Sequence, residues 1–239
     1  MRKTRHTGIL CLLASGGALI APAAGAAEGF GGSVAITTDY IYRGLSQTGG
    51  QPALQGGLRL TSSHGLSVGV WASSVEIADE STYELDLHAA FSVPLAPDWS
   101  GQIAYVHYAY PAWDGADYDY DELIASLSYQ QRLTAHISWS PNTSRYGYEQ
   151  FVSSEPSVAY ELSLLQPIGP RWSLSAGVGY HDLDELFGRG YWFWNAGVLL
   201  TWQSMQLDLM HIGTDGAARR IFGSETAGGR WIAALTWRF

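Results

Sequence analysis

The sequence contains one cysteine, Cys11, and no lysine beyond Lys3. Because Cys11 lies within the first 27 residues, disulfides and cysteine-bound metals are excluded from the rest of the chain. The same 27 residues hold three of the 13 basic residues and none of the 22 acidic ones. The remaining chain is therefore strongly acidic, which argues against nucleic acid as a partner, since binding phosphates requires basic patches.

Long hydrophobic runs are also lacking. The longest apolar stretch, Ile9 to Ile20, follows three basic residues and precedes the small residues Ala24-Gly25-Ala26. It is shorter than the roughly 20 residues of a membrane-spanning helix and has the layout of a secretory signal. Leu10 before Cys11 does not fit a lipoprotein signal, which has a small residue there. We expect residues 1–27 to be a cleaved signal peptide and residues 28–239 to form one domain.

In place of long apolar runs, apolar residues recur at every second position of the chain. Near the C-terminus, Trp231, Ala233, Leu235, Trp237 and Phe239 alternate with residues that include three polar ones. Successive side chains of a β-strand point to opposite faces, so this pattern suits a strand with lipid on one side and a polar lumen on the other. The dispersed 46% of hydrophobic residues and the low 15% of charged residues agree with such strands.

The same alternation predicts twelve strands, although the phase of the fifth, which is apolar or aromatic on both faces, stays open. The expected strands are residues 33–43, 53–62, 66–74, 82–93, 99–110, 121–130, 133–140, 157–165, 171–181, 191–202, 205–212 and 229–239. Trp and Tyr gather at strand ends, where they would lie at the two lipid interfaces.

The predicted connections alternate between short and long. Short links are expected at 63–65, 94–98, 131–132, 166–170 and 203–204, and long loops at 44–52, 75–81, 111–120, 141–156, 182–190 and 213–228. This asymmetry is typical of outer-membrane proteins, which have short turns on the periplasmic side. The sequence thus predicts an all-β, transmembrane, antiparallel up-and-down β-barrel of twelve strands with periplasmic termini, in the outer membrane of a Gram-negative bacterium.

The opposite phase of the strands supplies candidate pore-lining residues. They are Asp39, Arg43, Arg59, Glu84, Asp86, His88, His136, Glu161, His181 and Asp208, with Glu122 at the same phase. Charges inside a membrane barrel must face water or each other, so a hydrated or salt-bridged lumen is expected. Twelve tilted strands enclose a backbone radius of about 12 Å, which leaves a narrow pore for small solutes.

Two polar sets leave alternatives open. Glu84, Asp86 and His88 share a face and could bind a metal or form a cation-selective ring, although a network with arginines such as Arg43 or Arg59 is favoured. His136 and Ser138 also share a face, which suggests a lipid hydrolase, but two such residues are expected on any inward strand face. No catalytic residue, metal or cofactor is predicted.

The predicted long loops carry many acidic residues: Glu76, Asp79, Glu80, Asp114, Asp117, Asp119, Asp182, Asp184 and Glu185. The segment 117–122 could bind calcium through its carboxylates, but a calcium-loop glycine is missing at the needed place. A solvated acidic rim is the favoured interpretation. Its negative potential would attract cations and disfavour anionic solutes.

The segment Asp39-Tyr40-Ile41-Tyr42-Arg43-Gly44-Leu45-Ser46-Gln47-Thr48 resembles the N-terminal D-Y-x-x-R-G-x-S-Q motif of the TorF family of proteobacterial porin-like proteins. The resemblance implies an outer-membrane barrel that passes small solutes, with Trp237 and Phe239 forming a signal for the barrel assembly machinery. Within the motif, Tyr40 and Tyr42 are expected to face the outer interface and Asp39 and Arg43 the lumen. Asp39 could pair with Arg59 on the next strand.

These observations lead to three hypotheses of function. The favoured one is a small-solute porin that prefers cations or neutral solutes and contacts outer-membrane lipid and lipopolysaccharide. The second is a plugged structural or surface-binding barrel whose acidic loops bind cations or lipopolysaccharide. The third is the lipid hydrolase built on Ser138.

Overall fold

The computed structural model describes residues 28–77, 80–111, 118–147 and 150–239. The predicted signal peptide, residues 1–27, lies outside the described residues. No helix in the described part of the chain is long and apolar enough to cross a membrane.

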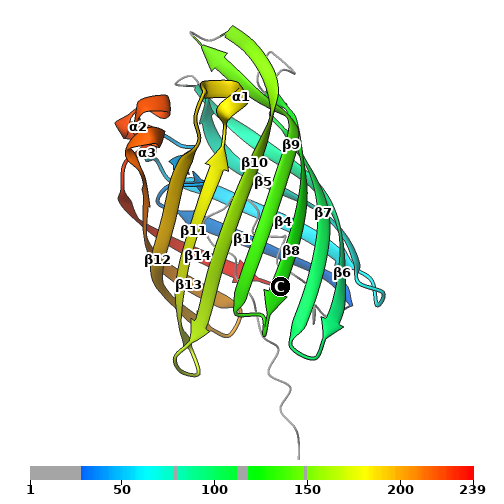
Figure 1. The fold of residues 1–239 in the computed structure, drawn as a ribbon. Coiled ribbons are helices and arrows are strands. Elements are labelled where there is room, and N and C mark those ends of the chain that lie inside the picture. Colours follow the sequence, from blue (N-terminus) through cyan, green and yellow to red (C-terminus); the bar gives the residue numbers. More distant parts are fainter. Residues whose placement is uncertain (1–27, 78–79, 112–117, 148–149) are drawn as a thin grey trace, which may run out of the picture.

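In these residues twelve antiparallel strands, each paired with its neighbours in the chain, form a closed barrel (Figure 1). The strands are β1 Gly29–Thr37, β4 Ala53–Thr61, β5 Leu66–Ile77, β6 Glu80–Ala96, β7 Trp99–Ala109, β8 Tyr120–Tyr129, β9 Leu133–Gly147, β10 Gln150–Pro167, β11 Trp172–Asp182, β12 Tyr191–Trp202, β13 Met205–Thr214 and β14 Arg230–Arg238. The predicted fold class is confirmed.

The barrel closes between its first and last strands. β1 and β14 pair in a register that places Ile36 opposite Leu235. Beyond β14, the backbone of Phe239 exchanges two hydrogen bonds with Gly32, of 2.9 and 3.1 Å. A Cβ on Gly32 would lie 2.7 Å from the Phe239 ring, so this seam requires glycine.

The outer surface carries the apolar phase of the strands. Exposed aromatic residues form two belts around the barrel, one at the end with the tight turns and one towards the other end. The first belt comprises Phe30, Trp99, Tyr129, Trp172, Trp202 and Trp237, and the second comprises Tyr83, Tyr105, Trp139, Tyr160, Trp192 and Trp231. Leucine and isoleucine side chains such as Ile103, 66% exposed, lie between the belts. Such a surface suits a bilayer with aromatic side chains at both interfaces.

Two segments that were predicted as loops are largely strands in the structure. Residues 75–81 and 141–156 were expected as long loops, but β5 and β6 extend to Ile77 and Glu80, and β9 and β10 to Gly147 and Gln150. These strands are therefore longer than the sequence predicts. Polar residues such as Asn142 and Ser144 weaken the alternation there, although the backbone pairing continues.

The two remaining long connections on the C-terminal side are folded. They contain the short helices α1 Asp184–Phe187, α2 Gly216–Phe222 and α3 Ser224–Ala227, which gather at the barrel end opposite the tight turns (Figure 1). Leu183, Leu186, Ala218 and Ala227 are buried there against Tyr191 and Phe193 of β12. This small apolar core fixes both segments to the barrel rim.

The largest departure from the predicted fold concerns the first strand. Residues 33–43 were expected as one strand, but β1 ends at Thr37. The chain then turns inward and forms a hairpin of β2 Ile41–Tyr42 and β3 Leu45–Ser46. Ile41 packs against Met210, Ile212 and Ile232 on the inner faces of β13 and β14. The hairpin therefore lies inside the barrel, and we call residues 38–48 the inner hairpin.

The fold also settles the phase of residues 99–110. Ile103 and Tyr105 face outward, whereas Ala104, Val106 and Tyr108 are buried on the inside with Ala90 and Ile124. Both faces are apolar because side chains form a packed apolar cluster on the inner face here. The sequence pattern could not distinguish the two faces for this reason.

Candidate pore constriction

The inner hairpin turns at Arg43 and Gly44. Both residues have positive φ, 47° and 80°, which is the conformation of a two-residue type I′ turn. Gly44 is required, since its φ favours glycine and a Cβ there would lie 2.7 Å from Thr214 and 2.8 Å from Phe193. Arg43 is unusual, because this position normally holds Asn, Asp or Gly and a left-handed conformation costs other residues about 1–2 kcal/mol. The contacts of its side chain offset that cost.

Arg43 lies at the centre of the lumen network. Its Nη1 and Nη2 donate hydrogen bonds of 2.8 and 3.1 Å to the two carboxylate oxygens of Glu122 on β8. Its Nε lies 3.6 Å from Glu161 Oε1 on β10, and its Nη1 lies 3.5 Å from His181 Nε2 on β11. The guanidinium also lies over the Tyr42 ring, 4.7 Å from its centroid. The turn therefore places one cation between three strands of the wall.

Asp39 anchors the base of the hairpin. Its Oδ1 accepts hydrogen bonds from Ser46 Oγ at 2.7 Å and Thr48 Oγ1 at 2.8 Å. Its Oδ2 forms an ion pair of 2.7 Å with Arg230 Nη1 on β14. The expected pair of Asp39 with Arg59 is wrong, because the chain leaves the wall before Asp39 and carries the carboxylate across to β14.

The tyrosines of the motif also correct the sequence-based prediction. Tyr40 and Tyr42 were expected at the outer interface, but Tyr40 is 4% exposed and both face the lumen. Tyr40 donates a 3.0 Å hydrogen bond to Glu84 Oε1, and Tyr42 donates one of 3.1 Å to Glu122 Oε1. The side chains of the motif do alternate between two faces of the chain, but both faces contact protein inside the barrel.

A second acidic group lies beside the hairpin on β6. Glu84 accepts hydrogen bonds of 3.0 Å from Tyr40 and Tyr110, and Asp86 is buried with its Oδ1 lacking a hydrogen-bond partner. In the described residues no ion pair reaches either carboxylate. Farther along β6, the His88 ring fills the space above Gly69, where a Cβ would lie 2.4 Å from it. The described residues contain no group of three ligands that could hold a metal ion, so Glu84, Asp86 and His88 do not form one.

His136 and Asp208 form their hydrogen bonds outside this network, although His136 lies opposite Glu161 in the β9–β10 register. His136 on β9 contacts Ser126 of β8, with 2.7 Å between Nδ1 and Oγ, and no hydrogen bond between His136 and Ser138 occurs in the described residues. Asp208 on β13 accepts a 2.6 Å hydrogen bond from Gln206 on the same strand. Arg59 on β4 is partly buried and lies level with Gly69 of β5. The hydrolase hypothesis gains no support from this arrangement, because the predicted serine and histidine do not contact each other.

The predicted acidic rim is described only in part. Asp79, Asp114 and Asp117 lie outside the described residues, and the side chain of Glu80 is not described. Asp119 accepts a 2.9 Å hydrogen bond from the backbone N–H of Tyr110. Asp121 faces outward on β8, where it contacts Tyr105, His107 and Asn142.

Carboxylates outnumber arginines around the hairpin. The carboxylates that meet it or lie beside it are Asp39, Glu84, Asp86, Glu122 and Glu161, and the arginines paired with them are Arg43 and Arg230. This excess of acidic side chains over their paired arginines is the main feature of the hairpin's surroundings in the described residues.

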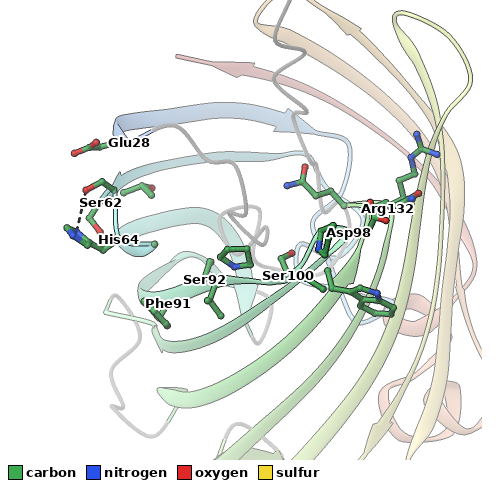
Figure 2. Close-up of a pocket in the computed structure, with 18 residues that line it drawn as sticks. Glu28, Ser62, His64, Phe91, Ser92, Asp98, Ser100 and Arg132 are labelled. Carbon is green, nitrogen blue, oxygen red and sulfur yellow. Dashed lines mark hydrogen bonds between the residues drawn. The ribbon is translucent and has the colours of Figure 1, made fainter.

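A separate hollow of about 840 Å³ lies at the end with the tight turns. Figure 2 shows Glu28, Ser62 and His64 on one side of it and Asp98 and Arg132 on the other. Its lining comes from the turns after β4, β6 and β8 and includes none of the ten predicted pore-lining residues. Sequence analysis missed it, because turn residues carry no alternation that would show where they face.

A closed twelve-stranded barrel with an apolar outer belt and a charged interior defines the class of porin-like β-barrels. Solved porins share the fold: the NanC porin has a TM-score of 0.58 at 7% identity over 87% of this chain and 98% of that one. The KdgM porin has a TM-score of 0.53 at 6% identity over 87% of this chain and 99% of that one. A structure of the KdgM porin in complex with disordered oligogalacturonate has a TM-score of 0.50 at 6% identity, over 88% and 98% of the two chains.

The chain belongs to the bacterial family described as "Bacterial protein of unknown function (Gcw_chp)", whose model matches residues 21–238. No curated protein sequence matches it.

Some residues of the constriction were missed by sequence analysis. Arg230 pairs with Asp39, and Tyr191 donates a 3.1 Å hydrogen bond to the carbonyl oxygen of Arg43. Ser46 and Thr48 were read only as part of the motif. A signal was present in Gly44, since glycine is favoured in the two-residue turn of a hairpin.

Proposed function

We propose that the protein is an outer-membrane channel for small solutes that prefers cations or neutral solutes. The single observation that carries the proposal is the Arg43 network, which forms a charged constriction within a barrel whose outer surface is apolar. Charged side chains at the narrow point of a pore set its selectivity, which supports the channel.

The predicted preference for cations rests on the excess of carboxylates around the inner hairpin. The porin of the KdgM structure is described in complex with oligogalacturonate, an acidic oligosaccharide. The negative lumen of the present chain would repel such a solute, so the shared fold does not imply that the two proteins pass the same solute. Small cations and neutral solutes fit the charge of this lumen better.

The hollow at the tight-turn end suggests a route that solutes would take through the barrel. Under the predicted orientation this end faces the periplasm, and the hollow forms an inner vestibule below the constriction (Figure 2). Solutes would enter at the end with the helices, pass the inner hairpin and leave through the vestibule. The pore-lining roles of the ten predicted residues and the cleavage of residues 1–27 belong to this proposal, as do assembly through Trp237 and Phe239 and contact with lipopolysaccharide.

The test is reconstitution of the folded barrel in planar bilayers under a KCl gradient. We expect single-channel events and a reversal potential of the sign that indicates cation preference. Correctly folded protein without any conductance or solute flux would refute the channel. An anion-selective reversal potential would refute the predicted preference but leave the channel intact.

The inner hairpin also favours a second candidate, a plugged barrel. Tyr40, Asp39 and Arg43 are each 5% exposed or less, so the hairpin fills the space around it. A permanently plugged barrel would show no flux in bilayers and no gain of flux when the hairpin is loosened by substitution. Binding of divalent cations or lipopolysaccharide to its loops would then be its measurable property.

A further inference from the structure

We propose that Glu122, Glu161 and the neighbouring tyrosines form a recognition site for organic cations that carry a guanidinium group. Arg43 is the internal ligand of this site. The solute class rests on the proposed channel function, whereas the binding site itself does not.

The contacts of Arg43 are those of a bound guanidinium. Glu122 receives the planar fork of the guanidinium on both of its oxygens, at 2.8 and 3.1 Å. Two parallel N–H···O bonds of this kind are specific for guanidinium, because they match its geometry as well as its charge. Glu161 adds a second carboxylate at 3.6 Å from Nε.

Tyrosine side chains contact both the guanidinium and Glu122. Tyr42 lies 4.7 Å below the guanidinium carbon, and Tyr108 donates a 3.3 Å hydrogen bond to Glu122 Oε2. Tyr108 is stacked on Tyr120 at 4.4 Å between centroids, with 8° between the ring planes. Aromatic rings and carboxylates together are the usual surroundings of bound organic cations.

The wall contributes most of this site. Glu122, Tyr108, Tyr120 and Glu161 belong to β7, β8 and β10, which are strands of the barrel wall. Only Arg43 and Tyr42 come from the hairpin. A solute with a guanidinium group would therefore find the carboxylate pair already arranged, and it would compete with Arg43 for it.

The acidic excess of the wall supports a cation as the ligand. Glu84 and Asp86 lie on the neighbouring part of the lumen, and Asp86 Oδ1 is buried without a hydrogen-bond partner. One arginine at the turn leaves these carboxylates without an ion pair in the described part of the chain. A solute that carries a second amino group could reach them from the Glu122 site.

The test removes the internal ligand and supplies it in solution. Arg43→Gly deletes the guanidinium and suits the positive φ of the turn, so the hairpin keeps its conformation. Methylguanidinium chloride at millimolar concentrations is the probe. Tetramethylammonium chloride is the control probe, because it carries the same charge but no N–H donor.

We expect methylguanidinium to raise the thermal unfolding midpoint of the Arg43→Gly barrel by about 5–10 °C at roughly 100-fold excess over its dissociation constant. Tetramethylammonium should leave the midpoint unchanged. Wild-type protein should respond at least about tenfold more weakly, since Arg43 occupies the site and lowers the apparent affinity. The double variant Arg43→Gly/Glu122→Gln should lose the response. If Arg43→Gly does not fold alone, methylguanidinium in the refolding buffer should restore folding.

Equal responses to the two probes, or no response and no rescue, would overturn the proposed site. The solute class is tested on wild-type channels by reversal potentials under bi-ionic conditions, where methylguanidinium should permeate several-fold better than tetramethylammonium after correction for mobility. Equal permeability would overturn the solute class. A barrel that binds the probe but never conducts would refute the channel and retain the site, so the two failures are distinguishable.

Discussion

The guanidinium of Arg43 and the carboxylate of Glu122 are joined by two hydrogen bonds, of 2.8 and 3.1 Å, across 79 positions of the sequence. Both side chains are almost completely buried, at 4% and 2% exposure. This pair connects the inner hairpin to the barrel wall at β8. Breaking such a buried pair on one side leaves a charge without compensation.

Arg43→Ala is therefore expected to destabilise the barrel by about 3–5 kcal/mol, because Glu122 and Glu161 remain buried without their cation. The protein that still folds should be more cation-selective, since the constriction becomes more negative. Urea titration of the folded band on gels measures the first effect and reversal potential the second. Normal stability together with wild-type selectivity would show that Arg43 does not lie at a constriction.

The pair of Asp39 with Arg230 leads to a prediction on the opening of the lumen. Asp39→Ala removes an ion pair and the two hydroxyl hydrogen bonds that hold the base of the inner hairpin. We expect a larger mean conductance with more frequent transitions, because the hairpin loses its anchor to β14. Ser46→Ala is the matched control: it removes one hydrogen bond, worth about 1 kcal/mol, and should leave conductance near that of wild type. Equal traces for Asp39→Ala and wild type would contradict the anchoring role.

Gly44 gives a test of the turn itself. Gly44→Ala should cost about 1–2 kcal/mol for the positive φ and about 1–3 kcal/mol more for the clash with Thr214 and Phe193. Gly188→Ala separates the two costs, since Gly188 has φ of 68° but nothing within 4 Å of its Cβ position. Denaturant midpoints of the two variants should therefore differ. Equal midpoints would mean that the inner hairpin does not pack against β12 and β13.

The closing seam predicts that Gly32→Ala slows or weakens barrel formation. Its Cβ would lie 2.7 Å from the Phe239 ring and 2.9 Å from the Gly57 carbonyl oxygen, so the ring must move and the backbone must shift. Gly31→Ala is the control, because its nearest neighbour is the Phe239 carbonyl oxygen at an ordinary 3.5 Å. Heat-modifiability on gels reports the folded fraction. A full folded band for Gly32→Ala would argue against the contact between Phe239 and Gly32.

The part of the barrel that lies within the bilayer can be tested by substitutions on the outer surface. Leu87 lies on the outer face of β6 and is 49% exposed, whereas Ile168 lies in a tight turn and is 58% exposed. In lipid vesicles Leu87→Arg should cost about 2–4 kcal/mol and Ile168→Arg about 0–1 kcal/mol, because the cost of arginine falls from the bilayer centre to the interface. Equal costs would contradict a bilayer around the middle of the barrel.

The sequence by itself determined the barrel. Alternation in Thr82 to Val93 or Gly229 to Phe239 specifies which face of a strand meets lipid, because the period of a strand is fixed by its backbone geometry. The alternation of short turns and long loops indicated which end of the barrel carries the termini. Twelve strands could be counted from these local signals, since each strand in such a barrel pairs with its neighbours in the chain.

Only the tertiary structure decided what the motif does. Residues 39–43 alternate as a barrel strand does, and a period of two is the same for a strand in lipid and for a hairpin packed within the lumen. Arg43 meets Glu122 and Asp39 meets Arg230 because the closed barrel brings distant strands around one axis. Such contacts depend on the curvature and register of the whole sheet, which no short segment of sequence encodes.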